Sequence, residues 1–508
     1  MSTEPRVPEG ALPELSDAAD QSDLAQFGYN QRLKRTMSTF TSFCLAFSMI
    51  AITGTLGSLL GPSLAQVGGI AVWGWALAFV GVIWIVLVFM HMAARIPVTG
   101  YAYQWASRIT SPYYGWLVAV VGIITFTTGA TSIGALFGSI LAPELGMAGT
   151  TTQIILLSSA ALTFCFVLNI LGIRIATHFN NGVAVSEIVI TLIFIIALLL
   201  GIAFFFDQSS GFSSLVNNHG PEGVNGHIPW ENFVFAATAP IFSLMGWEAS
   251  ADLAEETVDP RKAAPRAMFR AVCICSLGGL IVMGVVIAAI PGSIQHAVGE
   301  PNTMFWVAEQ HFGSFPAAIL KVIAFFSLLG CIVANIAVAT RLIFSVSRDR
   351  LLPFSKQLAS INVRWRTPVV ASVVLWAICM IINIAGGGNI FRITAMAVIA
   401  YYMTYALTVI AVIIGQRRRA IPEPTGPGYF GLGKGLIPVC CVALLWCVGV
   451  IVAYLAPSSN HYIIGYFGVA LGIGALLTIY AWSALRNGTA SVPGAAGAPL
   501  EVAEAADA

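Results

Sequence analysis

Twelve apolar stretches divide this chain, each about as long as a bilayer is thick. Spanning a bilayer takes about 20 apolar residues, and the backbone of a spanning segment must bond internally because hydrocarbon offers it no partners. The sequence therefore predicts an all-α polytopic membrane protein with twelve transmembrane helices. The stretches cover about residues 41–66, 69–92, 113–141, 153–173, 182–206, 233–254, 268–290, 316–345, 368–386, 390–414, 436–456 and 462–484.

Composition excludes several other classes. Of 508 residues, 57% are hydrophobic and only 9% are charged, far fewer than the surface of a soluble protein carries. The net charge of +1 gives no basis for a nucleic-acid partner. The nine cysteines lie in apolar stretches without metal-ligand spacing, and the seven histidines lie in loops or at span ends. We therefore expect no enzyme activity, no cofactor and no metal.

Lys and Arg gather in alternate connections between the stretches, with Arg392 as the exception on the other side. Such an asymmetry places the basic side in the cytoplasm and requires an even number of spans. We expect a multi-pass protein of the plasma membrane with both termini in the cytoplasm. The basic connections carry Arg95, Arg108, Arg174, Arg261, Lys262, Arg266, Arg270, Arg348, Arg350, Lys356, Arg364, Arg366, Arg417, Arg418, Arg419 and Lys434.

The first stretch is interrupted by small and polar residues, Thr53-Gly54-Thr55-Leu56-Gly57. Glycine weakens a helix interior, and Thr can bond its own backbone. One interpretation is a small-residue face that packs on a neighbouring helix. The other is an unwound segment that forms a binding site near the membrane midplane.

The sixth stretch is interrupted as well, by Pro240, Gly246 and Glu248. A carboxylate at this depth should face protein or water. Glu248 could therefore stabilise the broken helix through hydrogen bonds or handle substrate and protons. The following acids, residues 252–256, are expected at the cytoplasmic mouth, either as solvated charges or as a gate.

A matched pair of interrupted spans indicates a transporter built from inverted repeats. We predict two five-helix repeats of opposite topology, about 41–206 and 233–414, with discontinuous helices 1 and 6 and two extra helices at 436–484. This domain, 36–486, lies between an N-terminal tail, 1–35, and a C-terminal tail, 487–508, both expected to be cytoplasmic. The acidic residues 1 to about 26 and the C-terminal tail, which is rich in Ala, Gly, Pro and Glu, are expected to be disordered. Half-helix N-termini suit a carboxylate and freed carbonyls suit an ammonium group, so the site suits a zwitterion.

A second unusual acid, Glu187, lies about two turns inside the fifth stretch. It either extends to the cytoplasmic interface or places a carboxylate beside the broken first helix.

Four motifs in order resemble the amino acid–polyamine–organocation superfamily, and within it the branch of amino acid, GABA and choline permeases. The resemblance covers about residues 24–485. It is carried by the lead-in 24–35, the loop from Arg95 through Pro97, Gly100 and Tyr101 to Trp105, the pattern Phe242, Gly246, Glu248, and Arg341 followed by 347–353 and Thr367-Pro368.

The resemblance implies secondary active transport by alternating access, with the substrate carboxylate near Thr53–Gly57 and the amine near Phe242–Leu244 and an aromatic gate. Many relatives carry a Lys where this chain has Glu187, and the eighth stretch lacks a Ser/Thr pair of the kind that completes a sodium site. The acid favours either a cationic substrate or an acid-mediated proton step, and the missing pair favours protons over sodium. The expected substrate-binding residues are Ile52, Thr53, Gly54, Thr55, Gly57, Phe242, Ser243, Leu244, Gly246 and Trp247, and the expected coupling residues are Glu187, Glu248 and Asn335.

The predicted function is a permease that moves a small amino acid or a related amine such as GABA, coupled to protons. Its partners would be that small molecule, H⁺ and membrane lipid. The alternatives are a carrier of amines, choline or polyamines, an amino acid exchanger, and, more remotely, a transporter-like sensor. The paired broken helices argue against a channel.

Overall fold

The computed structural model describes residues 27–29, 35–216, 228–300, 302–362, 364–365, 367–423, 428–490 and 492. The predictions for residues 1–26, 30–34 and 493–508 lie outside these ranges. Within them the regular elements are helices. Two isolated β-bridges also occur, one between Met37 and Thr257 and one between Ser209 and Pro291. The predicted all-α class is confirmed for this part of the chain.

Each predicted spanning stretch coincides with helical structure. The first half of the chain forms α2 (Thr39–Ser48), α3 (Ile52–Val67), η1 (Gly68–Val72), α4 (Trp73–Ala93), α5 (Tyr101–Ile109), α6 (Pro112–Glu144), α7 (Thr151–Ile170), α8 (Ile173–Phe204) and η2 (Phe212–Val216).

The second half forms α9 (Trp230–Ala236), α10 (Thr238–Ser243), α11 (Ala249–Asp252), η3 (Ala254–Glu256), α12 (Pro260–Ala289), α13 (Ile294–Val298), α14 (Thr303–Phe312), α15 (Ser314–Arg348), α16 (Ser355–Leu358), α17 (Val369–Ala385), α18 (Ile390–Arg417), η4 (Gly433–Gly435), α19 (Leu436–Leu455), η5 (Ser458–Asn460) and α20 (Tyr462–Arg486).

Nine helical stretches of the described residues are long and apolar enough to cross a membrane. One of them, Thr39–Ala93, contains the first two predicted spans, and α17 is a shorter apolar helix. The sixth predicted span is divided into the short helices α9, α10 and α11. The count of twelve spans and the inverted repeat therefore stay predictions.

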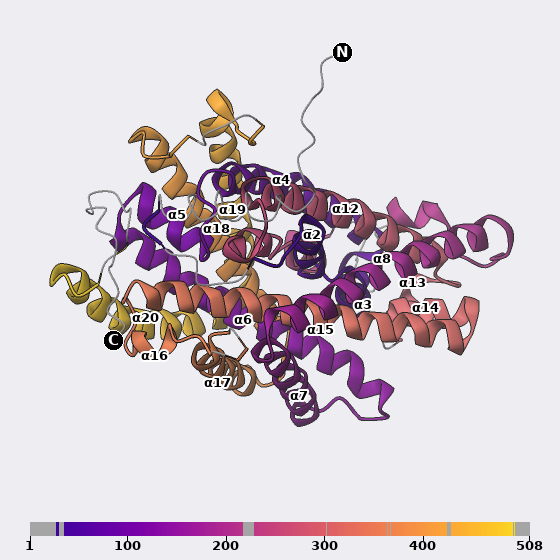
Figure 1. The fold of residues 1–508 in the computed structure, drawn as a ribbon. Coiled ribbons are helices and arrows are strands. Elements are labelled where there is room, and N and C mark those ends of the chain that lie inside the picture. Colours follow the sequence, from indigo (N-terminus) through magenta and orange to yellow (C-terminus); the bar gives the residue numbers. More distant parts are fainter. Residues whose placement is uncertain are drawn as a thin grey trace, which may run out of the picture.

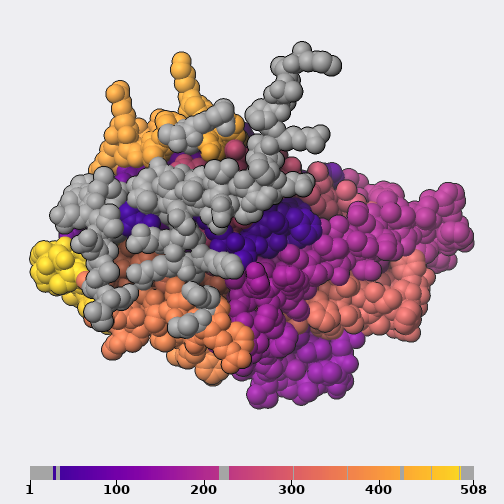
Figure 2. Space-filling view, viewed as in Figure 1, coloured from indigo at the N-terminus to yellow at the C-terminus, as the bar shows by residue number. Residues whose placement is uncertain are grey.

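The long helices lie alongside one another, with α13 and α14 at one end of the bundle and α5 and α16 at the other (Figure 1). We call the latter the α5 end. The indigo helix α2 packs between α8 and α12, two helices that are distant from it in the sequence (Figures 1 and 2). The yellow helix α20 lies at the periphery and packs on α6 and α18.

Helix α3 is enclosed by α15, α6, α10 and α14 and is almost entirely buried. Helix α8 instead exposes Leu192, Ile193, Ile196 and Leu200 on its outer surface. An apolar exterior around a buried small-residue helix is the arrangement expected in a lipid solvent.

Candidate functional site

The first span is broken at residues 49–51, between α2 and α3, and not at Thr53–Gly57 as the sequence predicted. Ala51 adopts a left-handed backbone with φ of 44°. The freed carbonyl of Met49 accepts a hydrogen bond from the thiol of Cys331 on α15, at 3.1 Å. The Thr-Gly segment forms the first turns of α3 instead.

The glycines of this segment are required for close helix packing. A Cβ on Gly54 would lie 2.5 Å from Cγ of Leu328 on α15, and one on Gly57 would lie 2.7 Å from the ring of Phe305 on α14. Such distances are shorter than van der Waals contact, so a side chain at either position would force Leu328 or Phe305 to shift. These contacts support the packing interpretation of the two glycines, and the unwinding lies before them.

Glu187 on α8 faces this break. It is 1% exposed, so it does not extend to the interface. Its Oε1 accepts hydrogen bonds from the backbone N–H of Thr53 at 3.0 Å and from the Thr53 hydroxyl at 2.6 Å. Its Oε2 has no hydrogen-bond partner among the described residues. The carboxylate thus binds the N-terminal end of α3, where the helix dipole favours negative charge.

The sixth span is broken between Ser243 and Ala249, where α10 ends and α11 begins. Gly246 has φ of 80°, a conformation that favours glycine. A Cβ on Gly246 would lie 2.3 Å from Cε of Met49. The breaks of the first and sixth spans therefore meet directly.

Glu248 stabilises the second break through hydrogen bonds. Its side chain is fully buried, and its Oε2 accepts from the hydroxyl of Tyr405 at 2.8 Å. The hydroxyl of Tyr405 in turn accepts from the N–H of Gly246 at 3.1 Å, and Tyr101 lies 3.3 Å from Oε1. Trp247 stacks on the ring of Tyr405. These contacts support the structural role for Glu248 that the sequence left open.

A small cavity lies where the two breaks meet. Its volume is ≈ 10 Å³, about the size of one water molecule. Of the predicted site residues, Thr55, Phe242 and Asn335 line it. The others lie in the same region without lining it: Ile52, Thr53, Gly54, Gly57, Ser243, Leu244, Gly246 and Trp247, together with Glu187 and Glu248.

Sequence reasoning missed several lining residues, among them Met49, Ile50, Ala51, Gly129, Cys331 and Tyr401. Met49, Ile50 and Ala51 form the break itself, which ends three residues before Gly54. The signal for Gly129 is weak, since Thr127-Thr128-Gly129 resembles other small-residue patches. Nothing in the local sequence distinguishes Tyr401 or Cys331.

Asn335 presents a polar group to the cavity. Its Nδ2 donates to the hydroxyl of Tyr401 at 3.0 Å, while its buried Oδ1 has no hydrogen-bond partner among the described residues. A Cβ on Gly129 would lie 2.9 Å from that Nδ2. The arrangement leaves a carbonyl oxygen that can accept a hydrogen bond from a ligand.

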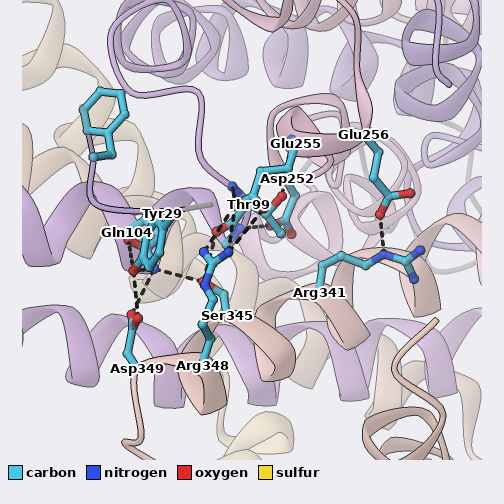
Figure 3. A network of polar contacts seen from close by, with 12 residues as sticks. Tyr29, Thr99, Gln104, Asp252, Glu255, Glu256, Arg341, Ser345, Arg348 and Asp349 are labelled. Carbon is cyan, nitrogen blue, oxygen red and sulfur yellow. Dashed lines mark hydrogen bonds and ion pairs between the residues drawn. The ribbon is translucent and has the colours of Figure 1, made fainter. Parts of the chain in front are cut away.

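The acids 252–256 are buried, so the prediction of solvated charges at this mouth is wrong (Figure 3). Arg341 binds Glu256 at 2.8 Å, and Arg348 binds Glu255 at 3.2 Å. Asp252 accepts from the N–H of Gly100, just before α5, at 2.9 Å. These pairs join α11, η3, α15 and the loop before α5, and they close the α5 end of the bundle.

Residues near the N-terminus add to this closure. The hydroxyl of Tyr29 donates to Asp349 at 2.7 Å, and the ring of Tyr29 lies 3.7 Å from the guanidinium of Arg348 (Figure 3). Gln104 on α5 also donates to Asp349, at 3.1 Å. Burial raises the pKa of Asp349, although the charge of Arg348 acts in the opposite direction.

Comparison with known families identifies the class of protein. The sequence model of the family described as amino acid permease matches residues 37–478. The chain belongs to the amino acid permease family. The family resemblance inferred from the four motifs is therefore confirmed, and this permease is a membrane transporter of the amino acid–polyamine–organocation superfamily rather than an enzyme.

Two relatives illustrate the range of this family. The permease is 24% identical to the amino-acid permease BAT1 of Arabidopsis thaliana, over 86% of this chain and 89% of the relative. It is 25% identical to the serine/threonine exchanger SteT of Bacillus subtilis, over 77% of this chain and 90% of the relative.

The structure shows the permease in a closed state. The central cavity of ≈ 10 Å³ is too small for an amino acid, and the α5 end is closed by buried ion pairs. Binding of any substrate at the two breaks therefore requires the surrounding helices to separate.

Proposed function

We propose that this permease is a secondary active transporter that carries a small amino acid, or a related amine such as GABA, together with protons by alternating access. The observation that supports this most is the contact between the two broken spans, with Glu187 bound to Thr53 at the start of α3. A substrate site and a titratable group thereby share one helix end.

The substrate site of this proposal lies at the two breaks. The N-terminal turn of α3, Thr53–Thr55, suits the substrate carboxylate. The Oδ1 of Asn335 and the backbone carbonyls after Phe242 suit the ammonium group. Thr55, Phe242 and Asn335 contact the cavity already, and in the proposal the rest of the predicted set joins the site when the helices separate.

Glu187 is the proton carrier in this proposal. As a carboxylate it accepts two hydrogen bonds from Thr53, and such charge-assisted bonds are roughly twice as strong as neutral ones. Protonation removes the charge and weakens both bonds. The N–H of Thr53 then becomes available to the substrate carboxylate, so binding of a proton favours binding of the substrate.

In this proposal Glu248 holds the second break in place and does not carry the proton. Its two carboxylate oxygens already accept from tyrosine hydroxyls, so it positions the second break and the aromatic residues Trp247 and Tyr405.

We also propose that the α5 end faces the cytoplasm and that the protein resides in the plasma membrane. Arg95 and Arg350 flank α5 and α15 in the sequence, and Arg348 is the last residue of α15, so these basic residues belong to the α5 end, which the positive-inside rule assigns to the cytoplasm. Both described ends of the chain then lie on the cytoplasmic side.

Uptake by purified protein in liposomes tests the function. The panel comprises neutral amino acids, GABA, basic amino acids, choline, ethanolamine and putrescine, each with and without an inward proton gradient. We expect saturable uptake of one zwitterion that stops when the gradient is collapsed. Uptake that ignores the gradient would contradict proton coupling.

An exchanger is the second candidate, because one relative is a serine/threonine exchanger. Exchange of preloaded substrate without net uptake would support it. Uptake of cations alone would favour an amine or choline carrier, with the carboxylate of Glu187 as its counter-charge. The absence of both uptake and exchange would favour a sensor.

A further inference from the structure

A second cavity, of ≈ 340 Å³, lies between the N-terminal end of α12 and the chain that leads into α19. Arg261, Lys262, Pro265 and Arg266 line it from α12, Met90 lines it from α4, and residues 428–430 line it from the other side. Three of these eight residues are cationic and none is acidic. The cavity is thus large enough for a small ligand and is lined by cationic side chains.

The wall opposite α12 is fixed by hydrogen bonds with the end of α4. Arg95, itself buried, donates to the carbonyl of Phe430 at 2.9 Å and to Glu423 at 3.0 Å. His91 accepts from the N–H of Leu432 at 3.1 Å. These contacts hold the segment before η4 against the end of α4, so the cavity is built by the fold.

The floor of the cavity is fixed as well. Arg261 is buried and donates to the backbone carbonyl of Arg95 at 3.1 Å. The end of α4 therefore anchors both sides of the cavity. The side chain of Arg95 binds Phe430 on one side, and the carbonyl of Arg95 binds Arg261 of α12 on the other.

The remaining two cations are accessible to a ligand. Lys262 lies 5.3 Å from the ring of Tyr429 and 3.5 Å from Asp259, which is outside the lining. Arg266 is exposed. The cavity also lies at the positive end of the 30-residue helix α12, which adds to the attraction for an anion.

We propose that this cavity binds a phosphate-bearing anion. Arg and Lys side chains at a helix N-terminus match the charge and the several acceptor oxygens of a phosphate group. Basic pockets between transmembrane helices on the cytoplasmic side are suited to anionic lipid headgroups.

The surface beside the cavity accommodates acyl chains. Past Arg266, helix α12 exposes Phe269, Ile274, Leu277 and Ile281 along its outer face. A lipid with its phosphate in the cavity would lay its chains along this apolar stripe. A soluble phosphate ester would use the cavity alone, so the two sources are separable by experiment.

Native mass spectrometry of the full-length protein in detergent tests the proposal. The probes are dioctanoyl phosphatidic acid, dioctanoylglycerol as the same lipid without phosphate, and glycerol 3-phosphate as the phosphate without chains. We expect the phosphatidic acid to bind and the dioctanoylglycerol not to bind. Equal binding of both lipids, or binding of no phosphate probe, would overturn the proposal.

A matched pair of variants localises the binding. Lys262→Ala with Arg266→Ala removes two charges from the cavity, whereas Arg417→Ala with Arg419→Ala removes two exposed charges at the C-terminal end of α18. We expect the first variant to weaken phosphatidic acid binding by about tenfold or more, and the second to leave it unchanged. An equal loss in both variants would mean general attraction to basic residues and would overturn the site.

Two further binding measurements distinguish a lipid from a soluble ligand and test whether charge alone is needed at position 262. Glycerol 3-phosphate bound as tightly as the lipid would support the phosphate site and identify a soluble ester as its source. Lys262→Arg, which keeps the charge, should bind as the unmodified protein does, and failure of this variant at unchanged melting temperature would count against the proposal. The readout is binding, so it does not depend on the proposed transport activity.

Discussion

The two broken spans meet at Met49 and Gly246, yet different parts of the molecule stabilise them. At the first break the groups come from two other long helices, the thiol of Cys331 on α15 and the carboxylate of Glu187 on α8. At the sixth-span break the carboxylate belongs to the broken segment itself, and the hydroxyls of Tyr101 and Tyr405 bind it.

This difference bears on the proposed coupling, in which Glu187 carries the proton and Glu248 supports the second break. A change of protonation at Glu187 alters only the bonds between α8 and the start of α3. A change at Glu248 would disturb hydroxyl groups and stacked rings that are fully enclosed, including Trp247 and Phe89. We infer that the first break responds to protons and that the second supports it.

Truncation of Glu248 should have the largest effect. Glu248→Ala leaves the hydroxyls of Tyr101 and Tyr405 without their acceptor and creates a hole, which costs about 3 kcal/mol of folding free energy. We expect a clear drop in the melting temperature of the purified protein. Glu248→Gln keeps an acceptor oxygen and should remain in the membrane at normal levels with impaired transport. Full transport in that variant would show that the charge of Glu248 is not needed and would leave this residue a structural role alone.

A side chain at Gly54, where the helix packs against Leu328, should have the next largest effect. Gly54→Ala places a Cβ within 2.5 Å of Leu328, and overpacking of this kind costs about 1–3 kcal/mol. Gly54→Leu should be worse, with loss of substrate binding. The double variant Gly54→Ala with Leu328→Ala should recover part of the melting temperature, and recovery of stability without recovery of binding would show that Gly54 also serves the substrate.

Neutralising Glu187 should change coupling more than stability. Glu187→Gln keeps the shape and an acceptor for Thr53 but cannot release a proton. We expect uptake in liposomes to persist at a reduced rate and to lose its dependence on pH and on the proton gradient. A pH profile identical to that of the unmodified protein would remove Glu187 from the coupling step.

Removal of the Thr53 hydroxyl should have the smallest effect. Thr53→Val deletes the 2.6 Å bond to the Glu187 carboxylate and leaves the backbone bond, a loss of about 1.5 kcal/mol. We expect a shifted pH profile of uptake at nearly unchanged melting temperature, with Thr53→Ser as the control that restores the profile. Identical profiles for Val and Ser would show that the backbone bond alone matters.

The sequence predicted correctly those features that depend on neighbouring residues, namely the helical spans and the two interruptions. Every predicted spanning stretch is helical, and both interrupted spans are broken. The position of the first break was wrong because glycine serves two purposes in a membrane helix. Gly54 and Gly57 permit close packing against α15 and α14, whereas the chain unwinds at Ala51, a residue with no breaker signal.

Local sequence also fails to predict the surroundings of the acidic residues. Residues 252–256 look like solvated charges in sequence, and only their partners Arg341 and Arg348, on another helix, explain their burial. Glu187 was recognised as unusual, but its bond to Thr53 joins residues 134 positions apart.

The sequence by itself determined that this chain lies in a membrane, which segments form helices, and that two spans are interrupted. Hydropathy and helix-breaking residues act within a few positions, so they can be read locally. The tertiary structure alone decided which groups satisfy the freed backbone, which charges pair, and which cavity each residue lines. In hydrocarbon a broken backbone must find its partners within the protein, and here those partners lie on distant helices such as α8, α15 and α18.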